Sequence, residues 1–204
     1  EKAKAYGVKT FVEVTCNDMG RDVQQLALLS EACDIHIIAA TGFYLDEYHP
    51  DFIDEASIEE IAEIFLQDLT VGIDNTGIRA GVIGEVASSE SMTKNEYKIL
   101  QASALAAKKA GCAIVTHCQL GKLGNEQADI FIEMGMNPQK VILGHIDLSN
   151  DLEYMCHLLD LGFNIAFDTI GKTAYLDDER RAENLKYLVD KGYSRQIVLS
   201  QDIS

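Results

Sequence analysis

Residues 112–145 read CAIVTHCQLGKLGNEQADIFIEMGMNPQKVILGH, and this stretch decides the fold. The runs 112–117 and 141–145 are apolar and rich in Val and Ile, which is typical of strands buried on both faces of a parallel sheet. Between them, 124–134 has a helical pattern and ends at Gly135, a residue that suits the left-handed position after a helix. The stretch therefore predicts two parallel strands joined by a helix.

The same alternation continues on both sides of this repeat. Further strands are expected at 8–15, 35–41, 78–85, 163–168 and 197–202. Further helices are expected at 20–33, 58–70, 94–109, 150–161 and 178–191, and the pairs Ser57/Glu60 and Thr93/Glu96 fit capping boxes that begin two of them. Strict alternation predicts an α/β fold with a parallel sheet covered by helices. A seven-stranded open sheet and an eight-stranded barrel both fit this pattern.

The two ends of the chain favour the barrel. The first residues, EKAKAYGVKT (1–10), resemble the inside of a helix that follows a strand, and the last ones, SQDIS (200–204), come just after a strand. One strand in front would make eight. We therefore expect a single domain over residues 1–204, a (β/α)₈ TIM barrel that lacks its first strand and C-terminal helices. A complete barrel typically has about 250 residues.

Composition narrows the class of protein. The chain is 47% hydrophobic and 25% charged, as expected for a soluble globular protein, and no apolar run reaches the roughly 18 residues of a membrane span. A formal net charge of −16 argues against nucleic-acid and membrane partners. A small anionic substrate remains possible, since bound divalent cations invert the local sign of the charge.

The cysteines indicate the compartment. There are five, an odd number, and none form a C-x-x-C pair. Free thiols in a reducing compartment are the simplest interpretation, and we expect a cytoplasmic protein.

Ionisable side chains end most of the expected strands. They are Glu85, His117, His145, Asp168 and Asp202. The C-terminal ends of barrel strands form one rim, where active sites lie. Imidazoles and carboxylates there suit divalent zinc or manganese, and two ions about 3.5–4 Å apart can share a hydroxide. On the pattern alone, a metal site and a set of structural residues both stay open.

The stretches of sequence around these residues resemble the phosphotriesterase-related family of the amidohydrolase superfamily. The matching stretches occur in the family's order and span essentially the whole chain: TFVEVTCNDMGRDVQQLALLSEACDIHIIAATGFY (10–44), GEVASSE (84–90), VTHC (115–118), LGHIDL (143–148), FDTIGK (167–172) and VLSQDIS (198–204). The resemblance implies a (β/α)₈ barrel with two divalent metal ions, zinc or else manganese. It implies a hydrolase whose metal-bridging hydroxide cleaves an ester or lactone of a small molecule.

The resemblance also implies roles for single residues. Glu85 takes the place of the bridging ligand, which is a carboxylated lysine in many members. His117 and His145 match the ligands of one metal ion. Asp202 matches the remaining ligand and the catalytic proton acceptor. Two side chains near the rim are expected to bind substrate, namely Lys172, which would meet an anionic group such as the phosphate of a sugar lactone, and Tyr44.

Two departures from the family pattern keep other functions open. No His-x-His pair, which the family carries on its first strand, occurs in the sequence. We attribute this to truncation, and a non-catalytic binding protein on a decayed barrel is the alternative. Thr169 follows Asp168 where phosphotriester-cleaving members carry His, which weakens the alternative of a phosphoric ester hydrolase. Asp147 either orients a ligand or caps its loop, and a homodimer is left open.

Overall fold

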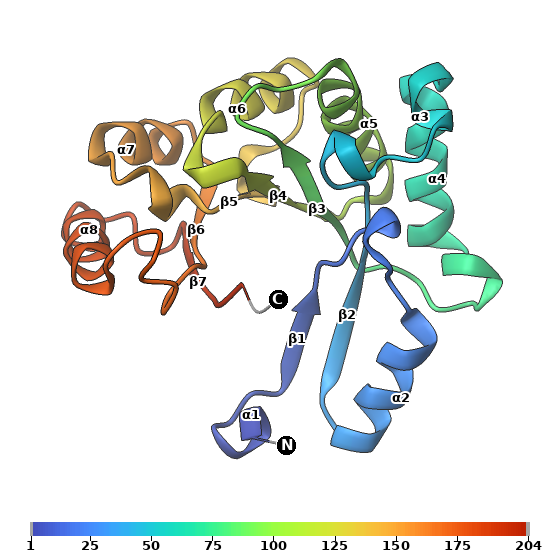
Figure 1. Cartoon of the computed structure of the whole chain (residues 1–204), viewed down its shortest axis with the longest axis horizontal. Coiled ribbons are helices and arrows are strands. Elements are labelled where there is room, and N and C mark those ends of the chain that lie inside the picture. The colour runs from blue at the N-terminus through green and yellow to red at the C-terminus, as the bar shows by residue number, and fades with distance from the viewer. Residues whose placement is uncertain (1, 203–204) are drawn as a thin grey trace.

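The computed structural model describes residues 2–202, in which seven parallel strands form one sheet. Their order in the sheet is their order in the chain: β1 (Thr10–Glu13), β2 (His36–Thr41), β3 (Val82–Ser88), β4 (Ala113–Cys118), β5 (Val141–Gly144), β6 (Asn164–Phe167) and β7 (Ile197–Leu199). The sheet curls into a half-barrel (Figure 1). The α/β fold and the parallel sheet are confirmed, whereas the eighth strand and the closing helices remain predictions.

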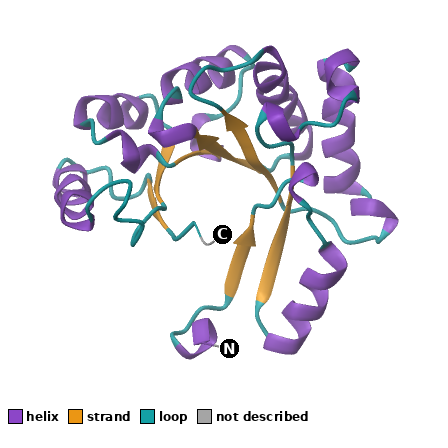
Figure 2. Ribbon diagram, in the orientation of Figure 1, coloured by secondary structure: helices purple, strands orange, loops and turns teal. Residues whose placement is uncertain are grey.

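Helices follow the strands and cover the outer side of the curled sheet (Figure 2). The helices are α1 (Lys2–Ala5), α2 (Val23–Cys33), α3 (Phe52–Glu55), α4 (Ile58–Thr70), α5 (Lys94–Ala110), α6 (Gly124–Glu133), α7 (Leu152–Asp160) and α8 (Asp178–Asp190). Short 3₁₀ turns lie between these elements: η1 (Asn17–Met19), η2 (Asp46–Tyr48), η3 (Ile73–Asn75), η4 (Gln119–Gly121), η5 (Pro138–Lys140) and η6 (Ile146–Ser149). Across residues 2–202, no helix combines the length and apolar character needed to cross a membrane.

The helix boundaries agree closely with the expected ones, because local capping residues set them. Ser57 and Thr93 each accept a hydrogen bond from the backbone three residues on, and both expected capping boxes form. Several strand boundaries were wrong, most clearly those of β3 and β7. The strand expected at 78–85 is β3, which begins at Val82 and continues to Ser88, and β7 ends at Leu199 rather than at 202.

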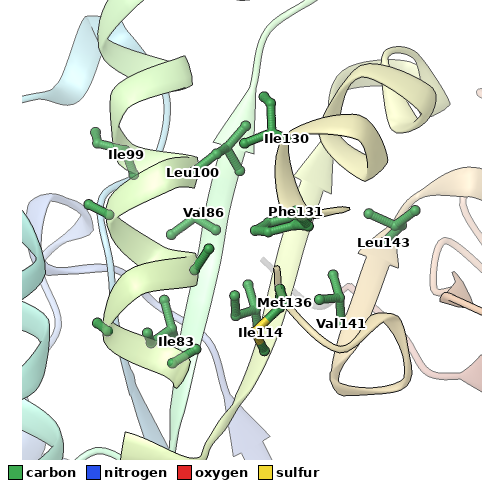
Figure 3. Close-up of a cluster of buried hydrophobic side chains, with 14 of the residues drawn as sticks. Ile83, Val86, Ile99, Leu100, Ile114, Ile130, Phe131, Met136, Val141 and Leu143 are labelled. Carbon is green, nitrogen blue, oxygen red and sulfur yellow. The ribbon is translucent and has the colours of Figure 1, made fainter. Parts of the chain in front are cut away.

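The main core lies between the sheet and helices α5 and α6 (Figure 3). Ile99 and Leu100 of α5 pack with Phe131 of α6 on the strands, where Ile114 and Leu143 are fully buried. Burial of each such side chain stabilises the fold by roughly 1.5–3 kcal/mol. This packing fixes β3, β4 and β5 relative to one another, and these strands carry the expected metal ligands.

Cover is thinner at the start of the sheet. The side chains of Phe11 and Val12 on β1 are 41% and 53% exposed, and Ile38 on β2 is also exposed. The first half of β2 is accessible to solvent, whereas its last three residues are buried. The best-buried part of the sheet is therefore β3 to β6.

Leu143→Ala is expected to lower the free energy of unfolding by about 2–5 kcal/mol, because it leaves a cavity at a fully buried position. Urea denaturation measures the change. Leu199→Ala is the matched control, since Leu199 also lies on a strand but is 55% exposed, and it should change stability by less than about 0.5 kcal/mol. Equal losses in the two variants would contradict this description of the core.

Candidate metal centre

Three expected ligands come together at the C-terminal side of adjacent strands. Glu85 lies on β3, His117 on β4, and His145 directly after β5. Parallel pairing aligns His117 with Ala87 on one side and with Gly144 on the other. One ligand atom from each of the three residues lies within 4.8 Å of those of the other two. Two imidazoles and a carboxylate at such separations fit a divalent cation such as zinc.

Glu85 reaches this cluster from inside its strand, which corrects the expectation that it ends the strand. The pairing of β3 with β4 shifts between Ile83 and Val86, so the chain bulges at Gly84 and Glu85. Gly84 suits the bulge because a Cβ there would lie 2.5 Å from the Val115 carbonyl oxygen. Bulges redirect side chains in this way at functional sites.

His145 is oriented by Asp168. Its backbone has a left-handed conformation, with φ of 59°, and its N–H donates to both oxygens of the Asp168 carboxylate, at 3.2 and 3.1 Å. The His145 Nδ1 lies 2.8 Å from Asp168 Oδ1. The opposite ring atom, Nε2, therefore faces His117 Nδ1 at 2.8 Å and Glu85 Oε1 at 3.4 Å.

His117 is held by side chains that the sequence did not single out. Its Nε2 lies 2.6 Å from Gln119 Oε1, and the Gln127 amide donates to its carbonyl oxygen at 2.9 Å. With Nε2–H donating to Gln119, the Nδ1 atom points toward His145 and Glu85. Both ligand rings are thus presented to the same point by hydrogen bonds at their far side, as is common for metal-binding histidines.

Burial and neighbouring charges set the protonation of the cluster. Burial raises the pKa of Glu85 to about 7, and His145 opposes this rise. Burial lowers the pKa of His117 to about 4, and the charge of His145 acts in the same direction. Burial alone would lower the pKa of His145, but the hydrogen bond and charge of Asp168 prevail and raise it to about 9. At pH 7, therefore, a cation has to displace a proton from His145.

Asp202 lies beside the cluster rather than within it. Its carboxylate is 2.6 Å from the Lys172 ammonium, and its backbone N–H donates to the Asp168 carbonyl oxygen. Its negative charge is near enough to contribute to the raised pKa of Glu85 and to oppose the lowered pKa of His117. Two of the expected residues, Asp202 and Lys172, are thus brought together as an ion pair.

Tyr44 reaches His117 from the loop after β2. Its hydroxyl lies 3.2 Å from His117 Nδ1, and the two rings meet edge to face. Its backbone N–H donates to the Asp18 carboxylate, which fixes the loop. Tyr44 therefore borders the cluster, and its role in binding substrate remains a prediction.

Asp147 does not contact a ligand ring and instead bonds to a distant arginine. It is fully buried, two residues after His145, and accepts hydrogen bonds from Arg181 Nε and Thr169 Oγ1, each at 2.8 Å. No contact joins its side chain to a ligand ring among the described residues. Its partner Arg181 lies on α8, 34 residues away in the chain, and no local pattern in the sequence links the two.

Comparisons with known proteins agree on one family. The family model described as "Phosphotriesterase family" matches residues 1–204. The phosphotriesterase homology protein of Escherichia coli is 35% identical over 199 residues, which cover 97% of this chain and 68% of that protein. The aryldialkylphosphatase of Saccharolobus solfataricus is 32% identical over 203 residues, 99% of this chain and 65% of that protein. The N-acetyltaurine hydrolase of Bos taurus is 31% identical over 212 residues, 98% of this chain and 61% of that protein.

Solved structures agree with these relatives. The Escherichia coli phosphotriesterase homology protein, complexed with phosphate in its active site, superposes with a TM-score of 0.97 at 34% identity, covering 99% of this chain and 70% of that one. A protein described as a weak promiscuous lactonase template for organophosphate hydrolysis has a TM-score of 0.92 at 33% identity, covering 98% of this chain and 65% of that one. The chain thus spans about two thirds of the length of its relatives.

The affinity of the cluster for zinc is expected to rise roughly tenfold per pH unit between pH 7 and 9. The raised pKa of His145 means that its proton persists up to about pH 9 and competes with the cation below that value. Below about pH 7, Glu85 also carries a proton and the dependence should steepen. Competition with a chromophoric chelator at several pH values measures the affinity, and a constant value from pH 7 to 9 would contradict the assignment.

Asp168→Asn is expected to weaken zinc binding by about 10–100-fold. The reason is that the charged carboxylate that accepts the hydrogen bond of His145 Nδ1 and orients the ring is replaced by a neutral amide. The comparison is sharpest at pH 9, where competition from protons is smallest. Asp151→Asn is the control: Asp151 caps α7, and Asn also caps helices well, so zinc affinity should not change. If Asp168→Asn binds zinc as tightly as the unaltered protein, Asp168 does not orient the ligand.

Proposed function

The chain belongs to the phosphotriesterase family, and from this we propose that it is a metal-dependent hydrolase that cleaves an ester or lactone bond of a small anionic molecule. One observation carries the proposal, namely the convergence of Glu85, His117 and His145 within 4.8 Å on the carboxyl side of three adjacent strands. Two relatives are named as hydrolases, an aryldialkylphosphatase and an N-acetyltaurine hydrolase.

The proposed metal complement is two divalent ions, zinc or else manganese. His117 and His145 would hold one ion, Glu85 would contact both, and Asp202 would complete the set. When bound, such ions lower the pKa of water enough for it to attack near neutral pH, and they polarise the oxygen of the scissile group. The arrangement of donor atoms on imidazole and carboxylate fits this class of cation.

Asp202 is the proposed proton acceptor. Its side chain is part-exposed and lies near the ligand cluster, so it can take the proton that water loses on attack. Its ion pair with Lys172 fixes the position of the carboxylate beside the cluster. A positioned acceptor of this kind contributes roughly 10²–10⁴-fold to the rate.

Lys172 and Tyr44 are the proposed substrate contacts. The Lys172 ammonium is part-exposed beside Asp202 and can attract a phosphate or carboxylate at the far end of a substrate. The phosphate in the active site of the Escherichia coli relative supports an anionic substrate. A phosphorylated sugar lactone meets both requirements, and the lactonase among the similar structures supports a lactone. Tyr44 would border the reacting end, where it meets His117.

Phosphoric ester hydrolysis is the second candidate, favoured by the aryldialkylphosphatase among the relatives. Thr169 counts against it, because its hydroxyl donates to the buried Asp147 carboxylate and so does not face substrate. A non-catalytic binding protein remains the candidate from another class, motivated by the lack of a His-x-His pair in the 204 residues.

The proposal also covers the compartment, the domain organisation and the partners of the protein. Cys16, Cys33, Cys112, Cys118 and Cys156 are all free thiols. Free thiols agree with a reducing compartment, and we place the protein in the cytoplasm as one domain over residues 1–204. Small molecules are its proposed partners, and a homodimer remains a prediction.

Zinc-supplied protein is expected to hold two divalent ions per chain and to hydrolyse lactones faster than phosphotriesters. His117→Ala should reduce the metal content to one ion or none, and Asp202→Asn should lower kcat by roughly 10²–10⁴-fold. Elemental analysis and a panel of lactones, phosphotriesters and N-acetyltaurine measure these effects. His157→Ala is the matched control, because His157 is exposed on α7 and should leave metal content and rate unchanged.

The outcomes separate the candidates. Faster turnover of phosphotriesters than of lactones would favour the phosphoric ester hydrolase. Full activity and metal content in Asp202→Asn would exclude Asp202 as proton acceptor. A protein that binds neither zinc nor manganese when supplied with them would end the enzyme proposal and favour the binding protein.

A further inference from the structure

Arg181 is a buried cation, and all three nitrogens of its guanidinium donate hydrogen bonds. It lies on α8 with a side chain that is 3% exposed. A guanidinium has five N–H donors in a rigid plane. Here the acceptors are Asp147 Oδ2 at 2.8 Å from Nε, the Leu176 carbonyl and Asp178 Oδ1 at 2.6 Å from Nη1, and Thr169 Oγ1 and the Lys172 carbonyl at 3.0 and 3.4 Å from Nη2.

Four of these acceptors belong to two different loops of the rim, and the fifth, Asp178, is the first residue of α8. Asp147 lies on η6, directly after the ligand His145. Thr169, Lys172 and Leu176 belong to the segment 168–177 between β6 and α8, which we call the β6–α8 loop. One guanidinium therefore joins the loop that carries a metal ligand to the loop that carries Lys172. The hydroxyl of Thr169, which also bonds to Asp147, closes the bridge.

Within the loop itself, hydrogen bonds are few and local. Of the side chains that it presents, Tyr175 is 61% exposed, and the short backbone bonds Lys172 to Thr169 and Tyr175 to Lys172 form only local turns. The Gly171 N–H donates to Asp178, which is itself bound to Arg181. From outside the loop, His145 contacts Asp168, Gln201 pairs with Thr169, and Asp202 contacts Lys172. Arg181 adds bonds at three positions of the loop, from Thr169 to Leu176.

Stability is a poor explanation for such a pair. Asp147 is 0% exposed, and taking both charges out of water offsets much of their attraction. Apolar side chains of similar volume often stabilise a fold as well as a buried ion pair. What an apolar replacement does not provide is four directed bonds to two loops. The bonds of Arg181 therefore suit a role in positioning the two loops relative to each other.

We propose that Arg181 is a positioning residue for anion recognition, which holds Lys172 at a fixed place relative to the metal centre through the β6–α8 loop. This inference rests on the proposed function. A substrate with an anionic group at one end and a scissile bond at the other would span Lys172 and the ligand cluster, so the separation of the two decides which substrates fit. Arg181 touches neither the substrate nor the metal and acts through Lys172.

The test uses Arg181→Lys, which keeps a cation beside Asp147 but loses most of the directed bonds. Arg180→Lys is the matched control, since Arg180 is the preceding residue on α8, exposed and paired only with Glu183. Hydrogen exchange of peptides covering 169–177 reports the order of the loop without zinc. Calorimetric titration of the zinc-loaded protein with inorganic phosphate reports anion binding, and it is repeated for Lys172→Met and for Arg181→Lys/Lys172→Met.

In Arg181→Lys, exchange in 169–177 is expected to accelerate while exchange in α7 stays constant, and phosphate affinity to fall roughly tenfold at unchanged zinc content. In the Lys172→Met background, Arg181→Lys should have no further effect on phosphate affinity, because its action passes through Lys172. Arg180→Lys should match the unaltered protein in both measurements.

Four outcomes overturn the inference. They are unchanged loop exchange in Arg181→Lys, unchanged phosphate affinity in Arg181→Lys, unchanged phosphate affinity in Lys172→Met, and the same loss from Arg181→Lys with or without Lys172. Failure of the proposed function looks different, since the unaltered protein would then bind no zinc even with an ordered loop. A lower melting temperature of Arg181→Lys with normal exchange and phosphate binding at 25 °C would make Arg181 a purely structural residue and also overturn the inference.

Discussion

The parallel pairing of β3, β4 and β5 is the constraint on which the site depends. Parallel strands deliver their carboxyl ends to one edge, so residues far apart in the chain become neighbours there. His117 stands level with Gly144, and His145 is therefore the next residue beyond it on the adjacent strand. Gly144 permits this approach, since a Cβ would lie 2.1 Å from the Thr116 carbonyl oxygen. The apolar core behind these strands holds the register.

This placement buries two imidazoles and a carboxylate close together, and hydrogen bonds to neighbouring side chains set their protonation. A buried imidazole tends to lose its proton and a buried carboxyl to keep one. Asp168 reverses that tendency at His145, whereas His117 follows it. The two rings consequently meet as a donor and an acceptor, at 2.8 Å, rather than as two cations. The two ring nitrogens can therefore lie close together, as a cation bound by both would require.

Local features of the fold could be predicted from the sequence, and features that depend on distant partners could not. The capping boxes at Ser57 and Thr93 depend on residues three positions apart, and they form as expected. The ligand residues could be found because they interrupt apolar runs. The bulge at Glu85 could not be predicted, because it arises from the pairing of β3 with β4. The sequence alone predicts that the strand ends where Glu85 interrupts the apolar run. The link between Asp147 and Arg181 has no local pattern at all.

The loop after β5 shows how the fold combines these levels. His145 has a left-handed backbone, a conformation that non-glycine residues rarely adopt and that surrounding structure has to impose. Asp168 holds this turn at its start by accepting the His145 N–H, and Arg181 holds it two residues later through Asp147. Asp168 and Thr169 are consecutive in the chain, so both supports return to the same point at the end of β6. A displacement of the β6–α8 loop would therefore move the support of His145 together with Lys172. Coupling of this kind makes the relative position of His145 and Lys172 a single property of the fold, which neither residue sets alone.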